Sequence, residues 1–142
     1  MENKVKVVVT GVHLRGNEEP EQIVTKSLAL WEDLENGAIR LTCDPIKDDA
    51  GEEILSKYVF YDNKIKSIRS GLCSSIMIFE KDKPYTTTYT TPYGKMDMDI
   101  KTTALKIRKA EDRNLIAEIG YELFSKGDLV SKTEIMIEVS AC

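Results

Sequence analysis

The sequence predicts an all-β fold, a single closed antiparallel β-barrel with up-and-down strand order. Three observations lead to this prediction. Hydrophobic residues recur with period two along most of the chain, which places them on one face of each strand. Turn sequences follow one another at spacings of roughly 10–20 residues, too close for the helices that connect parallel strands. Because about ten consecutive strands would leave unpaired sheet edges, closure into a barrel accommodates them best.

Size, charge and cysteine content narrow the functional classes. The 142 residues and 16.0 kDa predict one domain over residues 1–142. No apolar run is long enough to cross a bilayer and the N-terminus lacks a secretory pattern, so we expect a cytoplasmic protein without membrane contact. The net charge is −4 with both signs well mixed, which argues against nucleic-acid binding. The three cysteines form no CxxC motif, and we expect reduced thiols without metal or cofactor.

The individual strands follow from alternation along the chain. KVKVVV alternates lysine with valine near the N-terminus, and NLIAEIGYELF and TEIMIEV repeat the pattern near the C-terminus. Turns separate the strands, most clearly at Asn36-Gly37, because both central positions of a type I′ turn need positive φ. The expected strands are 4–13, 22–33, 38–44, 53–61, 64–70, 73–80, 84–91, 95–108, 114–125 and 128–139.

Residues 22–33 have two readings. Ile23, Val24, Leu28 and Trp31 share one helical face, and the preceding Glu-Glu-Pro resembles a helix start. Read as a strand, the segment places alternate residues on opposite faces. It leads directly into the Asn-Gly turn, and that turn favours a hairpin. The strand is the preferred interpretation, with the helix left open.

Five segments together resemble the YwiB-like family, namely IRSG, SSIMIFE, YTTPYGKMDMDIKTTAL, IGYELF and TEIMIEV. The likeness covers residues 4 to 139, and its most specific parts are Arg69 with Gly71 and the tyrosine–threonine pattern that ends at Tyr93-Gly94. This bacterial family, a domain of unknown function, implies a calycin-like (lipocalin-like) barrel and favours the strand reading of 22–33. It implies no reaction and no site residues.

The tract PYTTTYTT is the first candidate for binding chemistry. On a strand, Tyr85, Thr87 and Tyr89 share one face with Thr91, and the intervening threonines share the other. If the tyrosines point inward, they offer phenol groups on a cavity wall. Alternatively, both residue types are present as good strand formers. The sequence does not show which set points inward.

Arg69 is the second candidate. It shares a strand face with Ile65 and Ser67, so it could point into the barrel, where a guanidinium needs an anionic partner. A ligand carboxylate or phosphate would serve, as would a structural carboxylate of the protein itself. Tyr93 and Trp31 complete the candidate ligand-binding set, which is Arg69, Tyr85, Tyr89, Tyr93 and Trp31.

Catalytic and metal chemistry find little support. Asp97 and Asp99 are paired carboxylates, but Met96, Met98 and Ile100 alternate with them and are expected to take the buried face. The acidic segment 44–53 lacks the EF-hand spacing. His13 is the single histidine, and no nucleophile motif lies near it. We therefore predict no enzyme activity, no catalytic residue and no metal ligand.

Two functional hypotheses remain from different classes. The first is a non-enzymatic binding protein that holds a small, partly apolar or acidic ligand inside the barrel. The alternative is a solid-cored interaction module, a homodimer or adaptor. The segments SSIMIF and LALW are apolar on both faces, which indicates that something packs outside the sheet, and a second copy is the simplest partner.

Overall fold

The fold is a closed antiparallel β-barrel, as predicted, in a computed structural model that describes residues 3–16, 18–47 and 50–142. Ten strands follow one another around the barrel in the order β7-β6-β5-β3-β2-β1-β11-β10-β9-β8, and the short β4 pairs with β5 outside this path. Their bounds are β1 (Lys4–Leu14), β2 (Glu21–Asp33), β3 (Ile39–Cys43), β4 (Ile46–Lys47), β5 (Glu53–Phe60), β6 (Ile65–Ser70), β7 (Ser75–Phe79), β8 (Tyr85–Thr91), β9 (Gly94–Ala110), β10 (Asn114–Ser125) and β11 (Asp128–Ala141).

The expected up-and-down order is confirmed, because neighbouring strands around the barrel are also consecutive in sequence. The exceptions are β3 and β5, which the short β4 separates, and the β1–β11 pair that joins the two ends of the chain. The ambiguous segment 22–33 forms a strand, β2, throughout. Between β2 and β3, Asn36 and Gly37 take φ values of 63° and 79° inside a short 3-10 turn, Glu35–Gly37. The positive φ expected of this turn is therefore confirmed.

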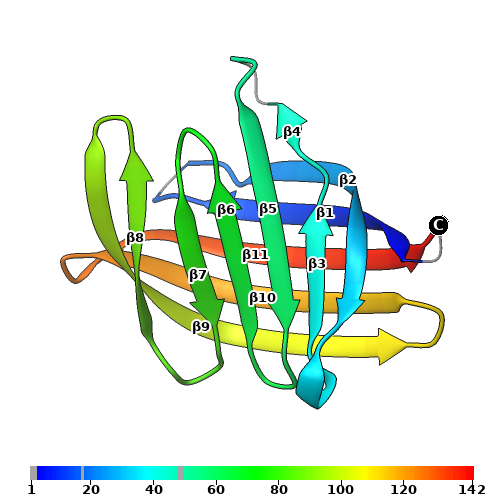
Figure 1. Cartoon of the computed structure of the whole chain (residues 1–142). Coiled ribbons are helices and arrows are strands. Elements are labelled where there is room, and N and C mark those ends of the chain that lie inside the picture. Colours follow the sequence, from blue (N-terminus) through cyan, green and yellow to red (C-terminus); the bar gives the residue numbers. More distant parts are fainter. Residues whose placement is uncertain (1–2, 17, 48–49) are drawn as a thin grey trace.

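The barrel closes between β7 and β8 through a short seam. Ser74 and Thr90 exchange two backbone hydrogen bonds, each 2.9 Å long. The hydroxyl of Thr87 adds a bond to the carbonyl of Ile76. Figure 1 shows β3, β5, β6 and β7 crossing β1, β10 and β11 at a steep angle, so two roughly orthogonal layers enclose the interior.

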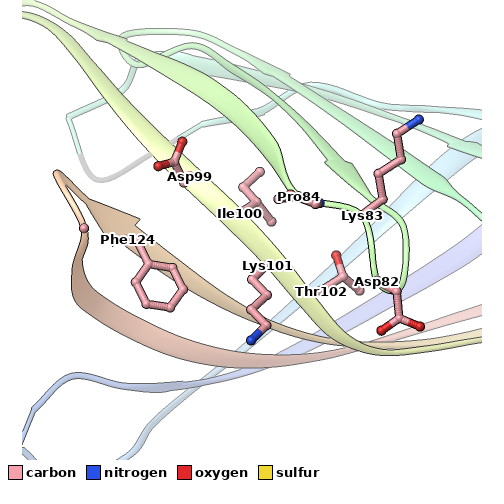
Figure 2. Close-up of a pocket in the computed structure, with 9 residues that line it drawn as sticks. Asp82, Lys83, Pro84, Asp99, Ile100, Lys101, Thr102 and Phe124 are labelled. Atoms are coloured by element: carbon pink, nitrogen blue, oxygen red, sulfur yellow. The ribbon is translucent and has the colours of Figure 1, made fainter.

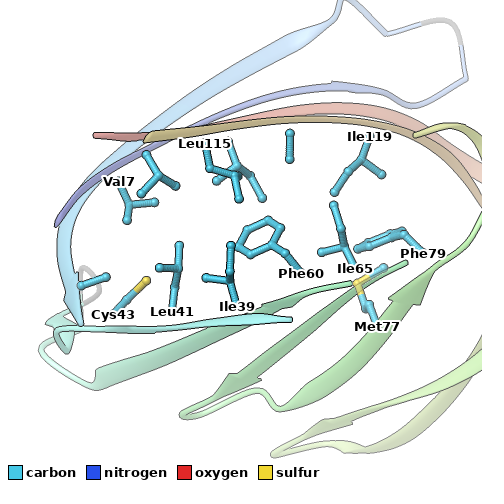
Figure 3. Packing of buried hydrophobic residues seen from close by; sticks show 14 of the residues in the cluster. Val7, Ile39, Leu41, Cys43, Phe60, Ile65, Met77, Phe79, Leu115 and Ile119 are labelled. Atoms are coloured by element: carbon cyan, nitrogen blue, oxygen red, sulfur yellow. The ribbon is translucent and has the colours of Figure 1, made fainter. Parts of the chain in front are cut away.

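The core lies between these two layers. In Figure 3, side chains from β1 and β10 meet those from β3, β5, β6 and β7. Phe60 and Phe79 are the largest of the fully buried side chains. On β6, exposure increases away from this region, from the buried Ile65 through Ser67 to the exposed Arg69, whereas the inward face of β10 stays buried from Leu115 to Leu123. The barrel is therefore filled less completely where β6 ends.

The acidic segment, the cysteines and the membrane-spanning potential were also considered in the sequence. Asp48 and Asp49 of the acidic segment lie outside the described residues. Cys43 is buried, whereas Cys73 and Cys142 are exposed, and the structure describes all three as free cysteines. In the described part of the chain, no helix has the length and hydropathy needed to cross a membrane.

Gly71, between β6 and β7, occupies a position that only glycine fits without strain. Its φ is 153°, and a Cβ at this position would lie 2.8 Å from the carbonyl oxygen of Glu53. We expect Gly71→Ala to lower the free energy of unfolding by about 2–3 kcal/mol, since it adds a steric clash to an unfavourable backbone conformation.

Urea unfolding of Gly71→Ala and of a matched control, Gly94→Ala, measures this effect. Gly94 also has positive φ, 128°, but no atom lies within 4 Å of its added Cβ. The control should lose only about 1 kcal/mol. Equal losses in the two variants would show that the contact with Glu53 does not matter.

Candidate functional site

The barrel is open along the first half of β2, which pairs with only one neighbouring strand. β3 pairs only with Ala29–Asp33 of β2, so the first half of β2 is hydrogen-bonded to β1 alone. In that half, Ile23 lies on the same face as the buried Ala29 and Trp31, yet its exposed fraction is 46%. Met96, on the inward face of β9, is 47% exposed. Inward-facing side chains at this end of the barrel therefore contact solvent.

Arg69 lies at this open end, on the predicted inward face of β6. Its neighbours across the ladders are Ser56 on β5 and Ser75 on β7, both small and polar. The guanidinium forms no ion pair with any described carboxylate. An arginine beside the interior normally has an anionic partner, so its positive charge remains available for a ligand.

Two tyrosines from different strands flank this charge. Burial raises the pKa of Tyr58, on β5, to about 12, and burial also raises the pKa of Tyr89, on β8. The positive charge of Arg69 lowers both values and so partly offsets the effect of burial. The register supports this arrangement: Tyr58 lies opposite Ser67, one step from Arg69 along the inward face of β6, and Tyr89 contacts Met77, which lies opposite Ser67 on the other side.

The polar groups continue across the barrel from Tyr89. Its hydroxyl donates to the sulfur of Met77 at 3.4 Å. Burial raises the pKa of Tyr121 to about 12, and the nearby Tyr89 raises it further. Tyr121 is also hydrogen-bonded to Thr133, which lowers this pKa. The hydroxyl of Thr133 lies 3.1 Å from Nδ1 of His13. We call Arg69, Tyr58, Tyr89, Tyr121 and Thr133 the polar layer.

The polar layer rests on the aromatic part of the core. The ring of Tyr121 lies 4.8 Å from that of Phe79, and the ring of Tyr58 lies 6.2 Å from that of Phe60, measured between centroids. Polar groups thus face the open end and aromatic groups lie beneath them. This arrangement suits a ligand with both a polar and an apolar part.

The other predicted site residues lie elsewhere. Trp31 is buried in the core and its indole donates to Asp33 at 3.1 Å. Tyr93 is 99% exposed in the β8–β9 turn. Tyr85 is four residues, or about 13 Å, along β8 from Tyr89. Of the predicted set, the polar layer contains only Arg69 and Tyr89.

Sequence reasoning missed Tyr58, although a signal was present. It alternates with Phe60 on β5, and in the hairpin it lies directly opposite Ser67, which shares the face of Arg69. Pairing 53–61 with 64–70 across the turn would have placed Tyr58 and Arg69 on one side of the sheet.

The structure also decides which face of PYTTTYTT points inward. Thr87 is buried and Tyr89 is partly buried, whereas Thr86 and Thr88 are exposed and donate to Asp99 and Asp97. The two aspartates are outside, as predicted. The expectation that Met96 would be buried with Ile100 is wrong, because Met96 lies at the open end where no core covers it.

A separate pocket of about 470 Å³ lies next to the loop between β7 and β8 (Figure 2). It is bordered by β9, by Phe124 and by the loop that carries Lys83 and Pro84. Lys83 lies 5.5 Å from the ring centroid of Tyr85, whose hydroxyl donates to Glu80 at 2.8 Å. The lining contains two lysines and two aspartates, so it offers no preference for a charged ligand.

Metal and thiol chemistry gain no support. Nowhere in residues 3–16, 18–47 and 50–142 do three or more His, Cys, Asp or Glu side chains gather in a way that could hold a metal ion. Burial raises the pKa of the Cys43 thiol, which keeps it protonated and weakly nucleophilic.

The buried phenols give the protein a specific sensitivity to alkali. The pKa of Tyr58 and of Tyr121 is near 12 in the folded protein against an ordinary value of 10.0. The folded state therefore holds these protons more tightly, and their contribution to stability is present below pH 10 and lost between about pH 10 and 12.

We expect Tyr58→Phe to flatten this alkaline loss by up to about 2–3 kcal/mol, because a phenylalanine has no proton to release. Urea unfolding at a series of alkaline pH values measures the effect. Tyr93→Phe, which removes a solvent-exposed hydroxyl, is the control and should follow the wild-type curve. Identical curves for all three proteins would contradict the burial of the Tyr58 phenol.

The structure is similar to that of a solved protein. Over 96% of this chain and 91% of the other, the structure is similar to the crystal structure of the YwiB protein from Bacillus subtilis, with a TM-score of 0.77 and 13% sequence identity. At that identity, the likeness establishes the fold alone. A comparison with curated proteins gives no match.

The family is established by the sequence itself. Residues 9–137 match the model of a domain of unknown function, DUF1934. That match spans nearly the whole barrel, from the middle of β1 to the middle of β11. Together with the YwiB-like fold, it confirms the resemblance found in the sequence, and the chain belongs to the DUF1934 family.

Proposed function

We propose that this protein is a non-enzymatic, cytoplasmic binding protein that holds a small acidic, partly apolar ligand at the open end of the barrel. The observation that carries the proposal is the guanidinium of Arg69, which pairs with no carboxylate among the described residues and lies on the same inward surface as Tyr58 and Tyr89. A ligand carboxylate, sulfonate or phosphate would supply the missing negative charge.

The two phenols fit the same anionic group. Because the pKa of both is raised, they are protonated at neutral pH, and each has one proton to donate. Tyr89 would exchange its weak hydrogen bond to the Met77 sulfur for one to an oxygen of the ligand. The apolar part of the ligand would contact Met77, Met98 and the aromatic residues beneath the polar layer. These residues line the inward face next to Tyr89.

The enzymatic alternative has less support. His13 contacts a threonine hydroxyl, and the buried Cys43 thiol has a raised pKa. Neither group is arranged with the partner that general acid–base or nucleophilic catalysis requires. Binding needs only the charge, the two donors and the apolar floor described above.

Native mass spectrometry of gently purified protein, with identification of any released molecule, tests for a retained ligand. Two fluorescent probes then test the site directly: 1-anilinonaphthalene-8-sulfonate and its uncharged analogue N-phenyl-1-naphthylamine. We expect Arg69→Ala to weaken binding of the sulfonate roughly tenfold, as expected for loss of a charge-assisted hydrogen bond, and to leave binding of the neutral probe almost unchanged.

Arg108→Ala is the matched control. Arg108 is an exposed arginine on β9, and it follows Ile107, which packs against the core, so its side chain lies on the outer face. This variant therefore makes the same change in net charge outside the barrel. It should bind both probes as the wild type does. Equal weakening of the sulfonate by Arg69→Ala and Arg108→Ala, or no weakening by either, would contradict the proposed site.

A further inference from the structure

We propose that the ligand carries a tetrahedral oxyanion, the head group of a sulfonate or a phosphate ester, on a short apolar part. This inference rests on the function proposed above and names the class of ligand within it. The observation that carries it is a set of three serines around Arg69. Ser56 and Ser75 lie directly opposite Arg69 on β5 and β7, and Ser67 precedes it by two residues on the same face of β6.

The three serine hydroxyls are available to a ligand. All three side chains are partly buried. Among the residues that the structure describes, no hydrogen bond involves their side-chain hydroxyls. Directly opposite residues of neighbouring strands have Cβ atoms only about 5 Å apart. The serines therefore form a floor of small side chains next to Arg69, with hydroxyl groups that can donate to an anion.

This floor favours a head group with three oxygens over one with two. A carboxylate has two oxygens in one plane, and a guanidinium that binds it in bidentate fashion faces both of them. A sulfonate or phosphate ester has a third oxygen outside that plane. When Arg69 holds two of the oxygens, the third can accept hydrogen bonds from Ser56 or Ser75, which flank the arginine.

The rows of side chains beneath Arg69 limit the apolar part of the ligand. From Arg69 toward the core, the next two rows across β5, β6 and β7 are Tyr58–Ser67–Met77 and Phe60–Ile65–Phe79. Phe60 and Ile65 are 0% exposed and Phe79 is 2% exposed, and all three lie in the packed core (Figure 3). Successive rows are about 7 Å apart along a strand. An apolar group that enters beside Arg69 thus has one row to contact before the filled core, which suits a single ring or a short alkyl chain.

Isothermal titration calorimetry with two matched probes tests the head group. Benzenesulfonate and benzoate have the same ring and the same charge, and they differ in having three and two oxygens. We expect the wild type to bind benzenesulfonate roughly fivefold more tightly, as expected for one additional hydrogen bond. The double variant Ser56→Ala/Ser75→Ala should lose this preference by weakening the sulfonate alone.

Ser70→Ala is the matched control for the serine variants. Ser70 follows Arg69 on β6, lies opposite Leu55 and faces the outside of the barrel, so this variant should keep the wild-type preference. Circular dichroism checks that each variant is folded. Inorganic sulfate, which lacks an apolar part, should bind about tenfold more weakly than benzenesulfonate, because it buries no ring. Equal binding of sulfate would overturn the apolar part of the proposal.

Alkyl sulfonates of different length test the depth of the site. Each additional buried methylene raises affinity about fourfold, so a long apolar channel would favour 1-octanesulfonate over 1-butanesulfonate by roughly a hundredfold or more. We expect a difference of less than about fivefold, because the additional methylenes of the longer chain stay in solvent. A preference for the longer chain of the size expected for full burial would overturn the short apolar part.

Arg69→Ala separates failure of this inference from failure of the binding site. If this variant binds both aromatic probes as the wild type does, or if no probe binds to the wild type, the binding site itself is wrong and the inference fails with it. If Arg69→Ala weakens both probes but the wild type binds benzoate as tightly as benzenesulfonate, the binding site stands and the tetrahedral head group is wrong. Persistence of the sulfonate preference in Ser56→Ala/Ser75→Ala would likewise overturn the role of the serines.

Discussion

Closure of the sheet between β7 and β8 is the constraint on which the rest of the structure depends. The Ser74–Thr90 backbone pair and the hydroxyl of Thr87 join the two strands at this point. Without that seam, the ten-stranded sheet would have two free edges and no enclosed face. The seam also brings Tyr89 of β8 next to Met77 of β7, and so places its phenol within reach of Arg69.

Unequal strand lengths explain why the closed barrel still has an open end. β9 has 17 residues, whereas β3 and β7 have five each. The long strands extend beyond the short ones, and their inward side chains continue past the region that Phe60 and Phe79 fill. A barrel of ten strands also encloses a wider interior than one of eight, which its own side chains can just fill. Space at one end is therefore a consequence of topology.

The inward and outward faces of the same strands carry different side chains. On β1 the inward series runs from the buried Val5 to His13, which contacts the polar layer, and the outward series carries Lys6, Val8 and Val12. Strand alternation keeps the two faces separate, since a substitution on one face leaves the other face in place.

The sequence by itself determined the strands, their order and the relative face of most residues. Alternation placed Arg69 with Ile65, and it placed Asp97 and Asp99 on the outside. Local chemistry was sufficient here, because period-two patterns and turn residues act between near neighbours in the chain.

Only the tertiary structure decided how deep each inward residue lies. Alternation gives a residue's face but not its position along the barrel axis, which depends on the lengths and tilt of strands distant in sequence. For this reason Trp31 lies in the core, Met96 lies at the open end, and Tyr58 joins Arg69. The polar layer comes from β5, β6, β8, β10 and β11, and only closure of the barrel brings these strands around one interior.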